Sequence, residues 1–165
     1  MNRVVIDARG VNFGFPREHP VLHDVSIQVA DEVVAVTGSS GSGKTTLLLC
    51  LAGILVPSAG EITVNGQQVS GGEPGSDQPG SDERSRIRRQ HLGLVFQFSE
   101  LVAELSLSEN VALPLELLGE SRRESRRAAL ELLEELGIGA HADRFPAQVS
   151  GGQAQRAAVA RALVH

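Results

Sequence analysis

The sequence has one cysteine, no tryptophan and no tyrosine. With a single cysteine, Cys50, no internal disulfide can form. Its position in an apolar run predicts a small buried side chain rather than a nucleophile or a metal ligand. This cysteine usage fits a reducing compartment. Five phenylalanines are the only aromatic residues among 165, so the core of one globular domain must be built from Val, Leu, Ile and Ala.

Positive charge is also scarce, since the formal net charge is −5. This balance gives no reason to expect nucleic acid as a partner. No apolar run reaches the length of about 18 residues that a membrane-spanning helix needs, and residues 1–7 lack the apolar core of a signal peptide. Any attachment to a membrane is therefore expected to come through a partner protein.

Short apolar runs rich in β-branched residues predict strands in the first hundred residues. Two of them, Val33–Val36 and Leu92–Phe96, are continuously apolar, which is typical of strands buried on both faces of a parallel sheet. Glu61–Val64 is expected to be an edge strand that ends at the turn Asn65-Gly66. Two further strands are expected at Val4–Ile6 and Val25–Val29.

Three helices are predicted. The segment Ser121–Gly137 is amphipathic, because apolar residues recur at i, i+3, i+4 and i+7, and Gly137 suits the position just beyond a helix end. The arginines at positions 122, 123, 126 and 127 are expected to form a solvated face of this helix. The other two helices are expected at Lys44–Leu55 and Gly151–Val164.

One segment, residues 70–85, differs in composition from the rest of the chain. It repeats Pro-Gly-Ser-Asp and has too few apolar side chains to pack. We therefore predict a flexible, solvated insertion loop within a single domain that spans residues 1–165.

The pattern G-x-x-x-x-G-K-[ST], which cradles nucleotide phosphates, is matched without exception at Gly38–Thr45. It lies between a predicted buried strand and a predicted helix, where backbone N–H groups and the helix N-terminus attract anions. Lys44 can reach the β- and γ-phosphates, and the Thr45 hydroxyl can ligate Mg²⁺. The predicted phosphate-binding residues are Gly38, Ser39, Ser40, Gly41, Ser42, Gly43, Lys44, Thr45 and Thr46.

A second anion-receptive helix start is predicted at Ser150-Gly151-Gly152-Gln153. Ser150 is a suitable N-cap, and Gly151 and Gly152 leave the helix N-terminus open to a phosphate. One domain cannot easily place both helix starts on one triphosphate. A head-to-tail pair of domains could, with the second motif closing over the nucleotide held by the other subunit.

Together these motifs resemble those of the ABC ATPases, whose signature motif is L-S-G-G-Q; here Val149 stands at the Leu position. Gln97 resembles the glutamine of the Q-loop. The resemblance implies that Gln97 contacts Mg²⁺ and the attacking water, senses the membrane partner, and serves as a catalytic group beside Lys44. Phe15 resembles the aromatic platform that stacks on adenine, with Phe13 as the alternative. Asp31 stands where the family usually has Gly.

The resemblance extends over residues 21–26, 51–62 and 109–115, and the last of these is similar to the lipoprotein-release and macrolide-export subgroup. It implies an α/β P-loop NTPase fold with a parallel core sheet, an N-terminal antiparallel β portion and a helical subdomain at about 107–149. It also implies ATP and Mg²⁺ as ligands, and ATP hydrolysis that drives export or lipid extrusion. The implied partners are a membrane permease and a second ATP-binding subunit, at the cytoplasmic face of the plasma membrane.

In the family, the signature helix is followed by a strand ending in Asp, the catalytic Glu and a switch His. His165 follows the signature helix directly and so does not match the switch His by position. We therefore expect the chain to be incomplete, to lack hydrolysis on its own, and to hydrolyse ATP only as the full-length protein.

Three alternatives remain open. A DNA-repair type of ABC ATPase would place a coiled coil between Lys44 and Ser150, and this interval has no sustained heptads. A cell-division or regulatory ABC subunit would transport nothing. A neighbouring gene that encodes a multi-span permease would favour a transporter over this alternative. A nucleotide-binding fragment without hydrolysis is the third alternative.

Overall fold

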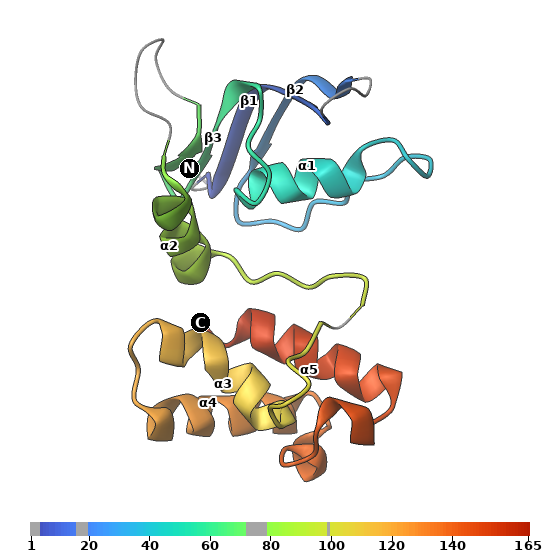
Figure 1. The fold of residues 1–165 in the computed structure, drawn as a ribbon, viewed down its shortest axis with the longest axis vertical. Helices are drawn as coiled ribbons and strands as arrows, with labels where there is room; N and C mark the ends of the chain where they lie inside the picture. The colour runs from blue at the N-terminus through green and yellow to red at the C-terminus, as the bar shows by residue number, and fades with distance from the viewer. Residues whose placement is uncertain (1–3, 16–19, 72–78, 99) are drawn as a thin grey trace. The chain divides into compact units, whose positions relative to one another are not determined.

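The chain folds as two units, a mixed α/β unit of residues 1–91 and a helical unit of residues 92–165 (Figure 1). The computed structural model describes residues 4–15, 20–71, 79–98 and 100–165. None of the helices in these ranges is long and apolar enough to cross a membrane.

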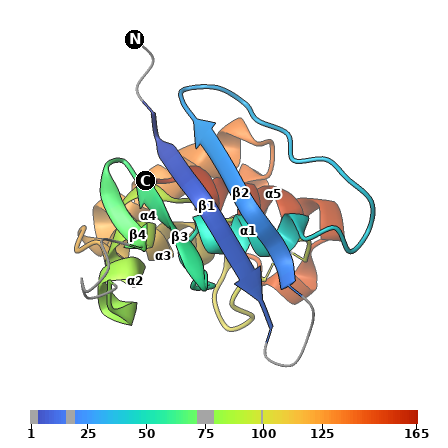
Figure 2. The same cartoon turned by 90° about the horizontal axis from the view of Figure 1, so that it is seen from above.

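The first unit is built on a four-stranded antiparallel sheet with the order β2-β1-β3-β4, and Figure 2 shows the strands side by side. In β1, Ala8, Val11 and Phe13 are buried. A register shift between Ala8 and Val11 keeps these side chains on the core face although they are three residues apart. The strands are β1 Ile6–Gly14, β2 Pro20–Val29, β3 Ala59–Val64 and β4 Gln67–Ser70.

The turn between β3 and β4 confirms one prediction and corrects another. Asn65 and Gly66 connect the strands with φ angles of 48° and 75°, as a tight two-residue hairpin requires. The prediction of an edge strand at Glu61–Val64 was wrong, because β3 pairs with β1 on one side and β4 on the other. The short run Val4–Ile6 marked only the start of β1, which continues to Gly14.

The two predicted parallel strands are not formed. Residues 33–37 and 92–96 have no strand conformation, and no strand in the described part of the chain pairs with either of them. The side chain of Val33 is 100% exposed, and Val95 is 43% exposed. A strand satisfies its backbone N–H and C=O groups only through a neighbour. Apolar composition alone is therefore not enough to make these runs strands.

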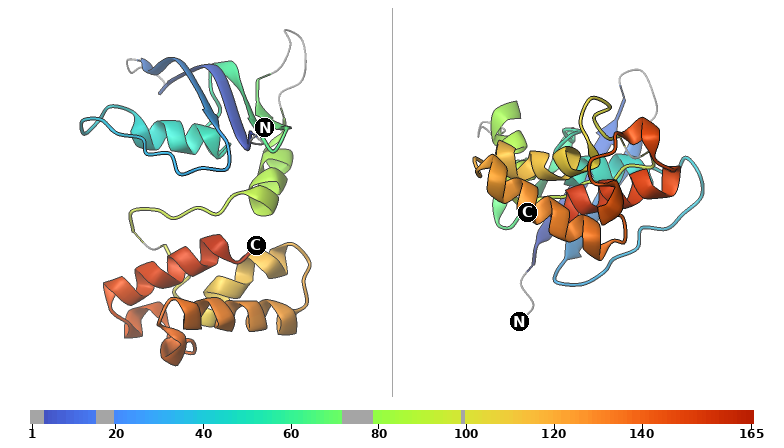
Figure 3. Two further views of the ribbon diagram at one scale, coloured as in Figure 1. Left: turned by 180° about the vertical axis from the view of Figure 1, so that it is seen from behind. Right: turned by 90° about the horizontal axis from the view of Figure 1, so that it is seen from below.

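Helix α1, Lys44–Leu51, packs along one face of the sheet (Figures 1 and 3) and buries Leu47, Cys50 and Leu51. Burial raises the pKa of the Cys50 thiol to about 11, which confirms the buried, unreactive side chain predicted from sequence. The helix ends four residues earlier than predicted, because Gly53 adopts a left-handed φ of 64°.

The end of α1 forms a Schellman motif. Gly53 N–H donates to the Cys50 carbonyl and Ile54 N–H donates to the Leu49 carbonyl, each at 2.9 Å. A Cβ built on Gly53 would overlap the methyl group of buried Val69. This position therefore requires glycine both for its backbone conformation and for its space.

Replacing Gly53 by alanine should lower the free energy of unfolding by about 2 kcal/mol, through left-handed strain and overpacking against Val69. Gly137 is the matched control, because it ends α4 with a φ of 67° and has open space around its Cβ position. Gly137→Ala should therefore cost about 1 kcal/mol, from strain alone. Urea unfolding measures both changes, and equal costs would contradict the role of Val69.

Both ends of the segment 70–85 have regular structure, where a loop was predicted. Ser70 belongs to β4, and helix α2 spans Ser81–His91; residues 72–78 lie outside the described ranges. Asp82 and Glu83 in the first turn and basic residues in the last turn favour this helix through its dipole. It packs through one fully buried apolar side chain, Ile87. Composition hid the helix, because it has so few apolar residues.

The second unit contains α3, Leu107–Leu117, packed against α4, Arg122–Glu135, and α5, Gly151–Leu163. Short 3₁₀ turns lie at Gly139–His141 and Pro146–Gln148. The predicted amphipathic and signature helices are confirmed within two residues. Their common core consists of Leu107, Val111, Ala112, Ala129, Leu133, Ile138, Ala142, Ala157 and Ala160.

The arginine cluster of α4 is exposed, as predicted. Arg126 pairs with Asp143 at 3.0 Å, and Arg122 pairs with Glu109 at 3.3 Å. Hydrogen bonds from Ser106, together with the nearby arginines, hold the pKa of Glu109 below its usual value. These pairs lie on a solvated face, where each contributes little to stability.

Candidate nucleotide site

The loop before α1 is shaped by its glycines. Gly41 and Gly43 have φ angles of 79° and 90°, which turn the backbone so that the chain enters α1 at Lys44. A Cβ on Gly43 would lie only 3.0 Å from Val21 Cγ1, so glycine also permits the close approach of β2. No side chain caps the helix and its first turn contains no acidic residue, so its N–H groups stay open to an anion.

Lys44 folds back over this loop. Its Nζ donates to the carbonyl oxygens of Gly38 at 3.0 Å and Ser39 at 2.7 Å. These two bonds hold the ammonium group at the mouth of the loop, beside the N-terminus of α1. Positive charge and open backbone N–H groups therefore converge on one place, which suits a phosphate.

A cleft of about 350 Å³ opens at the same place, lined by Phe15, Val21, Ser40, Gly41, Gly43, Lys44, Thr45 and Thr46. Of the lining residues that the structure describes, Lys44 alone is charged. Gly38 and Ser39 hold Lys44 through their carbonyl oxygens, and Ser42 N–H donates to the Ser39 carbonyl oxygen at 3.3 Å within the loop. Sequence reasoning missed Val21, which was noted only as part of the stretch 21–26 that resembles the family.

The structure distinguishes the two candidate aromatic residues. Phe15 lines the cleft and is 41% exposed, whereas Phe13 is 8% exposed and belongs to the core. The rings meet edge to face, with centroids 5.0 Å apart. Phe13 therefore supports the ring of Phe15 from behind, and Phe15 alone offers a surface to a ligand.

The remaining predicted residues lie in the second unit. Gln97 is exposed at a bend of the segment before α3. Ser150 caps α5: its Oγ accepts from Gln153 N–H at 3.3 Å, and Gln153 Oε1 accepts from Ser150 N–H at 2.8 Å. Gly151 and Gly152 are exposed, and the space at their Cβ positions is open. The first turn of α5 has no acidic residue, so this helix start is also open to an anion.

Comparison with known proteins extends over both units. A family model described as "ABC transporter" matches residues 22–165. The lipoprotein-releasing system ATP-binding protein LolD of Chromohalobacter salexigens is 46% identical over 150 residues, which are 90% of this chain and 60% of that protein. The LolD protein of Bordetella pertussis is 44% identical over 150 residues, covering 90% of this chain and 62% of its own length.

Solved structures agree with this match. The ATP-binding cassette MJ0796, solved as a dimer in a post-hydrolysis state with ADP and Pi, superposes with a TM-score of 0.82 at 34% identity. The match covers 96% of this chain and 69% of that one. The chain spans about 60% of the length of the curated relatives it matches. Its fold is of the α/β P-loop NTPase class, and the chain belongs to the ABC transporter family.

Proposed function

We propose that this chain is the nucleotide-binding part of an ATPase subunit that couples ATP binding and hydrolysis to transport across the cytoplasmic membrane, in the release or extrusion of lipoproteins or lipids. The observation that carries the proposal is the cleft at the N-terminus of α1, which is lined by the ammonium-bearing Lys44. The relatives described as lipoprotein-releasing ATP-binding proteins support the substrate class. Binding is assigned to this cleft, and hydrolysis to the whole protein.

The phosphates would lie on residues 38–46. The open N–H groups of the loop and of α1 would hold the β-phosphate, and Lys44 would turn from its two carbonyls to the β- and γ-oxygens. Phe15 would stack on the adenine. The described residues contain no cluster of three or more His, Cys, Asp or Glu that could hold a metal ion. The hydroxyl oxygen of Thr45 suits Mg²⁺, which usually takes few protein ligands and completes its shell with phosphates and water. A role for Gln97 as a second ligand stays a prediction, because Gln97 belongs to the other unit.

The second helix start, at Ser150, would act in a head-to-tail dimer. Its capping box keeps the N-terminus of α5 rigid, and its two exposed glycines leave room for a γ-phosphate held by a partner subunit. The similar cassette structures are dimers, which supports this arrangement. We further propose a membrane permease as the partner that holds the pair at the cytoplasmic face.

Nucleotide titration of the whole protein tests the assignment of the cleft. MgATP at a hundred times its Kd should raise the free energy of unfolding by about 2.7 kcal/mol. Replacing Phe15 by alanine should weaken ATP binding about tenfold, because base–aromatic stacking is lost. Tripolyphosphate, which has no base, should bind both proteins equally.

Phe145→Ala is the matched control, since Phe145 is 43% exposed and does not line the cleft. Its affinity for ATP should stay within about twofold of the original. Equal loss of ATP and tripolyphosphate affinity in Phe15→Ala would contradict stacking. A protein that binds neither ligand would overturn the cleft as a phosphate site.

A further inference from the structure

The segment that carries Gln97 is held on both sides by the C-terminal end of α5. On one side, a Cβ built on Gly93 would overlap the carbonyl oxygen of Ala162 and lie 2.8 Å from its Cα. The two backbones are therefore in direct contact. On the other side, Arg161 Nη1 donates to the carbonyl oxygen of Glu100 at 2.9 Å. Two neighbouring residues of α5, Arg161 and Ala162, thus contact the chain three positions after and four positions before Gln97.

The hydrogen bond made by Arg161 is charge-assisted. Its guanidinium is partly enclosed, and this burial lowers its pKa, although an arginine keeps its charge at neutral pH. Glu100 has a φ of 43°, an unfavourable conformation for a residue with a side chain. The charge-assisted hydrogen bond from Arg161 to its carbonyl oxygen helps to offset this cost.

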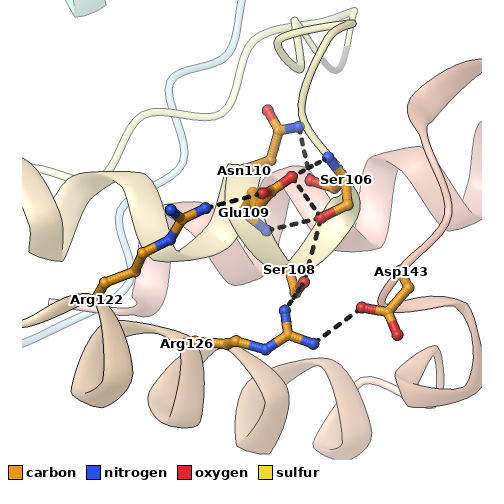
Figure 4. A network of polar contacts seen from close by, with 7 residues as sticks. All are labelled: Ser106, Ser108, Glu109, Asn110, Arg122, Arg126 and Asp143. Carbon is orange, nitrogen blue, oxygen red and sulfur yellow. Dashed lines mark hydrogen bonds and ion pairs between the residues drawn. The ribbon is translucent and has the colours of Figure 1, made fainter.

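The next part of the segment is fixed to α3 by Asn110, which is fully buried. Asn110 Oδ1 accepts from Val102 N–H at 2.7 Å, and its Nδ2 lies 3.0 Å from the carbonyl oxygens of Val102, Leu105 and Ser106. Figure 4 shows Asn110 beside Ser106, in the polar network at the start of α3. Gly93, Glu100 and residues 102–106 are therefore three successive points at which the chain is attached to helices of the second unit.

We propose that Arg161 is a positioning residue for Gln97. Through Arg161 and Ala162, α5 fixes the segment that carries Gln97, and the same helix begins at Ser150. Gln97 and the signature sequence therefore move as one body. The consequence for catalysis rests on the proposed function, because it requires Gln97 to act at the nucleotide.

A spin label on Phe98→Cys tests the anchor without any activity measurement. Phe98 is 75% exposed, whereas Cys50 is fully buried and remains unlabelled. In the whole protein, Arg161→Ala should increase the mobility of the label, and Arg161→Lys should restore part of the constraint. Arg126→Ala is the control, since it removes contacts to Ser108 and Asp143 in the same unit without touching residues 92–106. Unchanged mobility in Arg161→Ala, or an equal increase in Arg126→Ala, would overturn the proposal.

The kinetic measurement asks whether this anchor matters for the reaction. Arg161→Ala should lower kcat for MgATP about tenfold, with little change in KM, because misplacing a reacting group affects the transition state rather than ground-state binding. Arg126→Ala should leave kcat within about twofold. If Arg161→Ala increases the mobility of the label but leaves kcat normal, Arg161 does anchor the segment, and the catalytic role assigned to Gln97 is wrong. The two hypotheses are therefore distinguishable.

Discussion

Replacement of Lys44 by alanine is expected to lower kcat/KM for MgATP hydrolysis by the whole protein at least about 100-fold. Among the described residues, Lys44 is the only charged side chain in the lining of the cleft, and two backbone carbonyls hold its ammonium group at the start of α1. None of the other described lining side chains carries a charge that could replace it at the β- and γ-oxygens. The remaining backbone N–H groups would still bind phosphate, so binding should weaken less than hydrolysis.

Arg9→Ala is the control for this loss of charge. Arg9 lies in the same unit and pairs with Asp7 and Glu61, but it does not line the cleft. Its removal should leave vanadate-sensitive hydrolysis within about twofold of the original rate. A normal rate in Lys44→Ala would contradict the assignment of the site.

Lys44 is also the single lysine among these 165 residues, which permits a second measurement of the same site. An amine-selective acylating reagent should modify Lys44, and MgATP should protect it by engaging the ammonium group. Peptide mapping by mass spectrometry measures this protection. The measurement does not depend on hydrolysis, so it separates failure to bind from failure to react.

The features predicted correctly from sequence are those that local chemistry determines. The turn at Asn65-Gly66 needs two residues that tolerate positive φ, and the glycine at position 137 ends α4 for the same reason. The cap at Ser150 and the apolar spacing of α4 act within one or two helical turns. The left-handed turns at Gly41 and Gly43 are local in the same way, whereas the assignment of residues 38–45 to a phosphate stays a prediction.

The features that sequence could not supply depend on partners distant in the chain. Nothing within Glu61–Val64 tells which strands flank it, and an apolar run such as Val33–Val36 predicts a strand only where a neighbour exists to pair with it. Helix α2 was missed because its one buried residue, Ile87, gives no periodic signal. The place of Val21 in the cleft depends on how β2 approaches Gly43.

The second large predicted effect is a loss of stability, and it concerns Asn110 in the helical unit. Replacing Asn110 by alanine should lower the free energy of unfolding by about 3 kcal/mol, because it removes four hydrogen-bond contacts at a fully buried site, among them the acceptor of the Val102 N–H. Hydrogen exchange should accelerate first in residues 102–118. Denaturant unfolding of the whole protein, combined with exchange resolved by peptide, measures both effects.

Ser125 is the matched control on the facing helix. It is as fully buried as Asn110, but its hydroxyl has no hydrogen-bond partner among the described residues. Burial of an unpaired hydroxyl is unfavourable, so Ser125→Ala should be neutral or should raise the free energy of unfolding by up to about 1 kcal/mol. The opposite signs of the two changes would show that the contacts of Asn110, and not its burial or polarity, attach the segment after Gln97 to α3. Equal destabilisation by both substitutions would instead mean that this part of the core responds only to lost volume, and Asn110 would then have no special part in fixing that segment.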